Sequence, residues 1–377
     1  MGERGDGATL GGPDVAVAIE AHVTRAIARR AGLPPQSVGH FTSGGSEANG
    51  TALTCALTRA EPDFAAQGSR AFRGPPVFYV SQDCHLAWVK LAHMSGIGRD
   101  AARFVPTDEM GRLRTDALDA AIAADRRAGC VPVMIVATAG TTAAGMIDPL
   151  IRCAAIAQRE GLWYHVDAAW GGGAIASDRL RPLLAGIEKA DSITIDAHKW
   201  FATTMGSGMF LTRHPEAPAQ AFSVAANFMP SQAAELDPYM TTAQWSRRFM
   251  GLRLFLSLAA GGWAAHAEHV ERAVDLAQEL AAHAAERGWT IANEPRLAVA
   301  CLAPPPGSPP VRAIVEQVLR DGRVWLSAAT FAGRDVVRAC VTHGETSLDD
   351  IDAAIEALEA ARFGLAARTE RLEFVDA

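Results

Sequence analysis

A lysine and an aspartate beside two short apolar segments are the residues whose types and spacing point most directly to chemistry. Lys199 follows residues 191–196, which alternate like a buried strand, and Asp167 ends residues 163–167, a second predicted strand. The chain has three lysines among 35 basic residues, at positions 90, 189 and 199. A lysine amine, unlike a guanidinium, can lose its proton and attack a carbonyl carbon to form an imine. The count alone equally allows an ordinary surface lysine at 199.

Asp167 would supply the second group of such a site. Ligands in open α/β sheets gather beyond the carboxyl ends of the strands, which is where Asp167 falls. A carboxylate beside a pyridine nitrogen favours the protonated ring, which can then accept electrons. Asp167 and Lys199 lie 32 positions apart (199 minus 167), which leaves room for one crossover and the next strand. Together the two residues predict a site for pyridoxal 5'-phosphate, an aldehyde cofactor with a pyridine ring.

A glycine-rich turn at residues 42–49 (TSGGSEAN) precedes an apolar helical pattern. Free backbone amides at the start of a helix, aided by a hydroxyl group, bind a phosphate dianion well, so we expect Gly45 and Ser46 to contact it. An ordinary helix N-cap is the structural alternative. Gly44 and Ser46 also match part of the nucleophile elbow of hydrolases, but Ala48 replaces its second glycine.

Length and pattern predict an α/β protein with a large domain and a smaller companion. Strands at 77–81, 131–138, 163–167 and 191–196 alternate with helical segments, an order typical of a mainly parallel sheet. From residue 289 onward, short strands and helices alternate in an α+β pattern, with one strand expected at 323–327. We place the boundary between the two domains at residues 252 and 253, so the domains span 1–252 and 253–377.

Composition narrows the possible partners. The net charge of −7 leaves no basic face for nucleic acid, and no apolar run is long enough to cross a bilayer. The six cysteines have neither paired nor metal-ligand spacing, which is typical of core residues in a reducing compartment. No secretory signal is visible at the N-terminus. We therefore expect a cytoplasmic protein without a metal site that acts on a small molecule.

Four motifs, in one order, resemble the group II pyridoxal-phosphate decarboxylases, which include the aromatic amino acid and glutamate decarboxylases. They are residues 42–49 (TSGGSEAN), 138–142 (TAGTT), 165–170 (HVDAAW) and 196–200 (DAHKW). The similarity runs from about residue 11 to about residue 346. It implies the aspartate aminotransferase fold (fold type I), a homodimer with active sites at the subunit interface, and the release of CO₂ from an L-amino acid to give an amine.

The resemblance also assigns roles to individual residues. His85 matches the histidine that stacks on the cofactor ring, and Ala169 would pack on the opposite ring face. Thr142 would lie near the ring's 3-hydroxyl group or the substrate, and His198 belongs to the cofactor-binding set beside Lys199. Arg338 matches an arginine that can face the substrate carboxylate, although a structural ion pair is equally compatible.

The chain departs from the family pattern at two places. The longer N-terminal arm of the family, which contributes to the substrate pocket, is expected to be absent, so the substrate stays open. At the position of the loop tyrosine that protonates the product, this chain has Phe228, although Tyr239 could serve instead. Phenylalanine there accompanies oxygen-dependent aldehyde formation in relatives, so an aldehyde synthase is one alternative. Another lyase, a noncatalytic homologue and a Ser46 hydrolase are the others.

Overall fold

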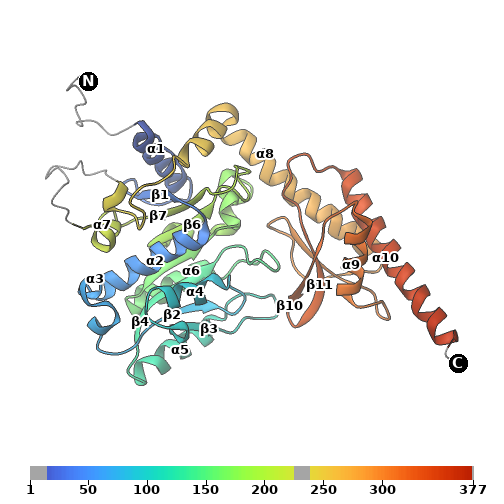
Figure 1. The fold of residues 1–377 in the computed structure, drawn as a ribbon, viewed down its shortest axis with the longest axis horizontal. Helices are drawn as coiled ribbons and strands as arrows, with labels where there is room; N and C mark the ends of the chain where they lie inside the picture. The colour runs from blue at the N-terminus through green and yellow to red at the C-terminus, as the bar shows by residue number, and fades with distance from the viewer. Residues whose placement is uncertain (1–14, 225–237, 376–377) are drawn as a thin grey trace, which may run out of the picture.

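A seven-stranded sheet forms the centre of the larger part of the computed structural model, which describes residues 15–224 and 238–375 (Figure 1). The strand order is β1-β7-β6-β5-β4-β2-β3. Pairing is parallel from β6 through β5, β4 and β2 to β3, whereas β7 is antiparallel to both β6 and β1. The mainly parallel sheet predicted from the sequence is thus confirmed. Its strands are β1 (Val38–Thr42), β2 (Pro76–Ser81), β3 (Ala102–Val105), β4 (Val131–Thr138), β5 (Trp163–Asp167), β6 (Ser192–Asp196) and β7 (Gly208–Thr212).

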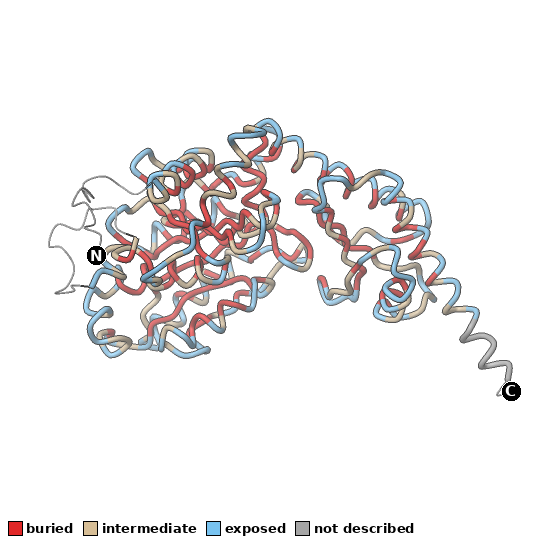
Figure 2. The backbone as a smooth tube through the Cα atoms, turned by 45° about the horizontal axis from the view of Figure 1, so that its top comes forward, coloured by how far each residue is buried: buried red, intermediate tan, exposed pale blue. Residues whose placement is uncertain are grey.

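Helices cover both faces of this sheet, because successive strand residues point to opposite sides. On β4, Met134 and Val136 belong to the core beneath α2 (Gly45–Ala60) and α4 (Ala87–Met94). Ile135 and Ala137 belong to the opposite core, beneath helices α1 (Val15–Arg30), α5 (Thr115–Arg127) and α6 (Leu150–Glu160). The short helices α3 (Phe64–Gln67) and α7 (Ala217–Phe222) contact α2. Figure 2 shows the buried chain concentrated in this sheet.

A smaller antiparallel sheet forms the centre of the second part of the chain (Figures 1 and 2). The long helix α8 (Gly251–Glu286) leads to it and bends at Gly262, whose φ of 63° suits glycine. No helix in the described part of the chain is both long and apolar enough to span a membrane. The predicted domain boundary between residues 252 and 253 falls between the two sheets in the sequence. The division into two domains stays a prediction. This sheet has the order β10-β11-β9-β8, with β8 (Thr290–Ile291), β9 (Val299–Ala303), β10 (Ser327–Phe331) and β11 (Arg334–Cys340). It packs with α8 and α9 (Val311–Asp321), and α10 (Leu348–Val375) lies against these two helices.

The predicted elements agree with the structure wherever their apolar pattern is strong. Strands β4 and β5 have the predicted bounds. The strand predicted at residues 323–327 is wrong, because β10 only begins at Ser327 and Trp325 is 74% exposed. Strands β1 and β3 were not predicted. β1 contains Gly39 and His40, and it becomes a buried strand only because β7 pairs with it.

Candidate active site

A cavity of about 370 Å³ lies at the carboxyl ends of β4, β5 and β6. The chain leaves each of these strands in a loop, and the loops converge because the strands are parallel neighbours. All eight residues that the sequence predicted for the site line this one cavity, although their roles stay a prediction. They are Gly45, Ser46, His85, Thr142, Asp167, Ala169, His198 and Lys199.

Lys199 lies in the tight turn after β6, and its amine faces a carboxylate that the sequence analysis had not singled out. Lys199 Nζ lies 3.0 Å from Asp196 Oδ2, and the lysine side chain is 37% exposed whereas that of Asp196 is 3% exposed. Burial raises the pKa of Asp196, and the Lys199 ammonium opposes that rise. The cavity therefore holds a reachable amine anchored by a buried acid.

Asp167 ends β5 and is almost completely buried. Its Oδ2 accepts hydrogen bonds from Asn49 Nδ2 at 2.7 Å and Trp88 Nε1 at 3.3 Å, and its Oδ1 accepts one from the Ala169 amide at 3.2 Å. Three donors thus hold both oxygens of this carboxylate in place. The sequence pattern did not predict a role for Trp88. Asn49 lies within the motif of residues 42–49, but no role was predicted for it either.

The glycine-rich turn places the start of α2 at the cavity. Gly44 precedes α2 and offers no side-chain cap. The first backbone amides of the helix therefore lack a hydrogen-bond acceptor within the helix. Ser43 ties the turn to the helix, because its hydroxyl and its amide both donate to Glu47 Oε2, at 2.6 and 2.8 Å. No hydrogen bond joins Ser46 to a histidine among the described residues, although His85 and His198 line the same cavity.

Two histidines take fixed positions at the cavity. His85 Nδ1 accepts a hydrogen bond from the Ala87 amide at 3.1 Å, which leaves Nε2 as the nitrogen that can carry the proton. His198 Nδ1 accepts one from the Ser207 amide at 3.2 Å, and its Nε2 lies 3.7 Å from Asp196 Oδ2. Both rings are thereby oriented by backbone amides, which fixes the nitrogen that each presents.

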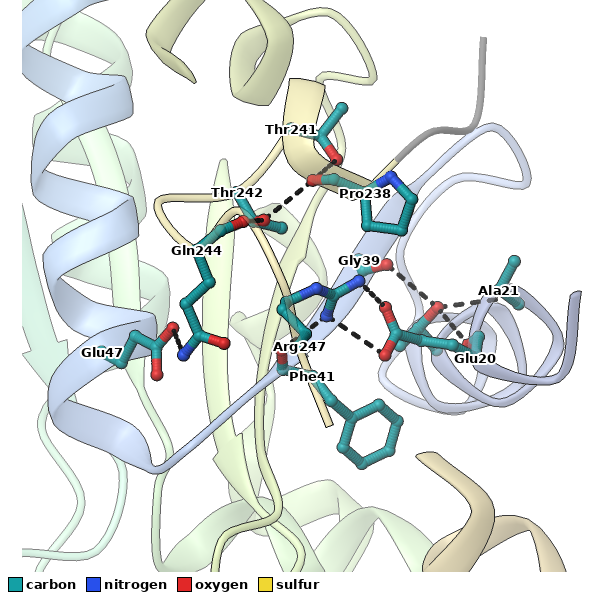
Figure 3. A network of polar contacts seen from close by, with 11 residues as sticks. Glu20, Ala21, Gly39, Phe41, Glu47, Pro238, Thr241, Thr242, Gln244 and Arg247 are labelled. Atoms are coloured by element: carbon teal, nitrogen blue, oxygen red, sulfur yellow. Dashed lines mark hydrogen bonds and ion pairs between the residues drawn. The ribbon is translucent and has the colours of Figure 1, made fainter. Parts of the chain in front are cut away.

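Polar contacts outside the cavity attach the segment that follows residue 237 to the glycine-rich turn (Figure 3). Gln244 Nε2 donates to Glu47 Oε1 at 2.6 Å. Arg247 bonds both carboxylate oxygens of Glu20 on α1, at 2.6 and 3.2 Å, and the Phe41 carbonyl on β1 at 2.9 Å. These contacts connect α1, β1 and the start of α2 into one support for the site.

Neither Phe228, at the position of the family's loop tyrosine, nor the alternative donor Tyr239 is among the described residues that line the cavity. Phe228 falls in residues 225–237, which the structure does not describe. Tyr239 is buried and stacks on Trp245 with ring centroids 4.8 Å apart. It does not line the 370 Å³ cavity in this structure.

The residues present fit pyridoxal phosphate. A Cβ added at Gly45 would lie 3.0 Å from Asp196 Oδ2 and 3.2 Å from the Ala169 Cβ, so a larger residue at the helix start would crowd the cavity wall. Asp196 Oδ1 and Thr138 Oγ1 are buried at the cavity without a hydrogen-bond partner. The amine, the buried carboxylate and the helix start match the aldehyde, the ring nitrogen and the phosphate. The fold and the residues of the cavity thus place this chain in the class of proteins that bind pyridoxal phosphate.

Comparison with known proteins gives the family. Residues 13–303 match the model of the pyridoxal-dependent decarboxylase conserved domain, and the chain belongs to that family. It is 34% identical to cysteine sulfinic acid decarboxylase of Mus musculus over 270 aligned residues. That alignment covers 70% of this chain and 54% of the relative. Over 192 residues it is 45% identical to aspartate 1-decarboxylase of Aliivibrio fischeri, 48% of this chain and 35% of the relative.

A solved structure extends the match to the fold. The crystal structure of mouse CSAD superimposes with a TM-score of 0.87 at 30% identity, and the alignment covers 92% of this chain and 76% of that one. The expected fold type is confirmed. The chain nevertheless spans only about a third to a half of the length of the two curated relatives.

Proposed function

We propose that this protein is a pyridoxal-phosphate-dependent decarboxylase that converts an L-amino acid to the amine and CO₂. The observation that carries the proposal is the shared cavity of the Lys199 amine and the Asp167 carboxylate. Bound pyridoxal phosphate supplies an aldehyde and an electron-accepting ring, which are what loss of a carboxylate from an amino acid requires. The family membership of residues 13–303 supports the same reaction.

Each residue then has a role that follows from its surroundings. Lys199 would hold the aldehyde carbon, and Asp196 would keep the amine in place before the cofactor binds. Asp167, held in place by its three donors, would face the ring nitrogen and favour a proton there, because an opposite charge stabilises the protonated ring.

The remaining cavity residues would bind the rest of the cofactor. Gly45 and Ser46 would bind the phosphate at the start of α2, with His198 nearby. His85 and Ala169 would enclose the ring.

We propose an amino acid with an acidic side chain as the substrate. Arg338 supports this, because its Nε donates to the carbonyl of Thr142 at 2.7 Å, at the edge of the cavity. Within the described ranges Arg338 contacts the Thr142 carbonyl and the Cys340 side chain but no carboxylate, so its positive charge could pair with a substrate anion. The relatives named for cysteine sulfinic acid and aspartate support the same class.

We also propose a cytoplasmic homodimer with the cavity at its interface. Met205 lines the cavity and is 76% exposed, and Leu86, next to His85, is 69% exposed, which favours a partner surface there. Met205→Glu should lower the dimer fraction in sedimentation equilibrium, whereas Phe363→Glu on α10 should not. The six free cysteines fit a reducing compartment.

The decisive experiment uses the small number of lysines in this chain. Borohydride reduction of the protein with pyridoxal phosphate, followed by peptide mapping, should label Lys199 and spare Lys90 and Lys189, which are both exposed. Lys199→Ala should remove both the label and CO₂ release, whereas Lys90→Arg should retain them. Label at another lysine would overturn the proposal.

The products distinguish the remaining alternatives. We would assay L-aspartate, L-cysteine sulfinate, L-glutamate, L-2,4-diaminobutyrate and an aromatic amino acid for CO₂, amine, aldehyde and peroxide. An amine with CO₂ supports decarboxylation, whereas an aldehyde with peroxide indicates an aldehyde synthase. Cofactor binding without any product would indicate a noncatalytic homologue.

A further inference from the structure

A row of buried polar side chains runs from Asp167 into the interior of the sheet. Asn49 Nδ2 donates to Asp167 Oδ2 at 2.7 Å, and Asn49 Oδ1 lies 3.1 Å from His165 Nε2. His165 Nδ1 lies 2.8 Å from Ser192 Oγ, which also accepts a hydrogen bond from Trp163 Nε1 at 2.8 Å. All five side chains are at most 5% exposed, so these contacts are made without competition from bulk water.

The contact with Asp167 sets the direction of the bonds in the row. Asn49 Nδ2 donates to Asp167, so Asn49 presents its Oδ1 acceptor to His165. The proton of a neutral His165 then lies on Nε2 and points to Asn49 Oδ1. His165 Nδ1 is left as an acceptor for the Ser192 hydroxyl, and Ser192 Oγ accepts from the Trp163 indole, which can only donate.

The surroundings of His165 keep its ring neutral. Burial lowers its pKa to about 4, although Asp167 opposes that shift. The ring is also faced by the Thr194 hydroxyl, 3.4 Å from Nε2, and by the edge of Trp88 at 5.6 Å between ring centroids. Neither the Thr194 hydroxyl nor the Trp88 indole carries a charge, so neither would compensate a protonated ring.

We propose that Trp163, Ser192 and His165 are positioning residues that form a one-way hydrogen-bond relay and set the orientation of the Asn49 amide toward Asp167. If the proton of His165 moved to Nδ1, Asn49 would have to turn its NH₂ group to the ring. Its oxygen would then face the Asp167 carboxylate, and two acceptors in contact repel. The relay thus controls whether Asp167 meets a donor or an acceptor, although none of the three residues lines the cavity.

The direction of the relay can be measured without cofactor. Long-range ¹H–¹⁵N NMR of histidine-labelled protein should show His165 as the neutral Nε2–H tautomer between about pH 5.5 and pH 8. Ser192→Ala removes the hydroxyl that donates to Nδ1, so the share of the Nδ1–H tautomer should rise. A wild-type His165 that carries its proton on Nδ1, or on both nitrogens, would overturn the relay.

The effect on the site rests on the proposed function, because Asp167 is taken to face the cofactor ring. Ser192→Ala should weaken pyridoxal phosphate binding roughly tenfold, since a buried, charge-assisted hydrogen bond at Asp167 is lost or misdirected. Ser192→Thr keeps the hydroxyl and should restore binding. The matched control is Ser37→Ala, because Ser37 is also buried but its hydroxyl has no partner.

The two measurements separate the two failures. Equal cofactor affinity of Ser192→Ala and Ser37→Ala would overturn the influence of the relay on the site. A wild-type protein that shows the Nε2–H tautomer yet does not turn yellow with pyridoxal phosphate would overturn the proposed function and leave the relay standing. Circular dichroism of each variant checks that the fold is retained.

Discussion

Replacement of Arg247 tests how the support of the site is built. The ion pair between Arg247 and Glu20 is nearly dry, with side chains that are 9% and 11% exposed, and the arginine also bonds the Phe41 carbonyl. Arg247→Met keeps the apolar stem but leaves the Glu20 carboxylate buried without its cation. Breaking one side of a buried pair costs about 3–5 kcal/mol. With a urea slope of about 3 kcal/mol per M, the midpoint should fall by about 1 to 1.7 M.

The pH dependence provides a second, independent test of the same pair. Burial raises the pKa of Glu20 above its usual 4.5, and Arg247 partly counteracts the rise. A carboxyl group whose pKa is higher in the folded than in the unfolded state binds a proton on folding. Its contribution to the free energy of unfolding therefore grows as pH falls through the pKa of the folded state and is lost as pH rises. Without Arg247 this pKa rises further, so the deficit of Arg247→Met should shrink between about pH 7.5 and pH 5.5.

A double variant provides the control for this reasoning. Glu20→Gln combined with Arg247→Met removes the stranded charge and should recover roughly half of the lost free energy of unfolding at about pH 7.5. The interpretation would be refuted if Arg247→Met cost less than about 1 kcal/mol, as an exposed pair does. It would also be refuted if the deficit did not change with pH.

Three further predictions concern the site and the contact between the two parts of the chain. Gly45→Ala should weaken pyridoxal phosphate binding roughly tenfold in an absorbance titration, because the new Cβ would lie 3.0 Å from Asp196 Oδ2; unchanged affinity would contradict this packing. Gln244→Ala should weaken cofactor binding several-fold through the freed Glu47, with less than about 1 kcal/mol lost in urea unfolding. Asn293→Leu should cost about 2–4 kcal/mol, since it strands the Ala144 and Val299 carbonyls and the Cys301 amide; faster hydrogen exchange at Cys301 would accompany the loss.

Local patterns in the sequence predicted much of the fold and of the candidate site. β4 and β5 are buried on both faces, so each is a run of consecutive apolar residues. Such a run can be recognised from the local sequence alone. Lys199 and Asp167 stand at strand ends, and parallel neighbouring strands bring such ends together. The glycine-rich turn at residues 42–49 likewise combines a loop and a helix start within a few positions.

The partners of these groups depended on contacts between distant parts of the chain. Asn49 reaches Asp167 across 118 positions, and Arg338 reaches Thr142 across 196. No spacing rule encodes such pairs, because they depend on how α2 packs against β4 and β5 and on how β11 meets the loop that follows β4.

By itself, the sequence determined the strand ends, the lysine, the aspartate and the helix start, because each depends on a short run of residues. Only the tertiary structure decided that Asp196 holds the amine and that Trp88 and Asn49 hold Asp167. Hydrogen bonds act over about 3 Å, so a partner is known only once the backbone has brought the two side chains within that distance.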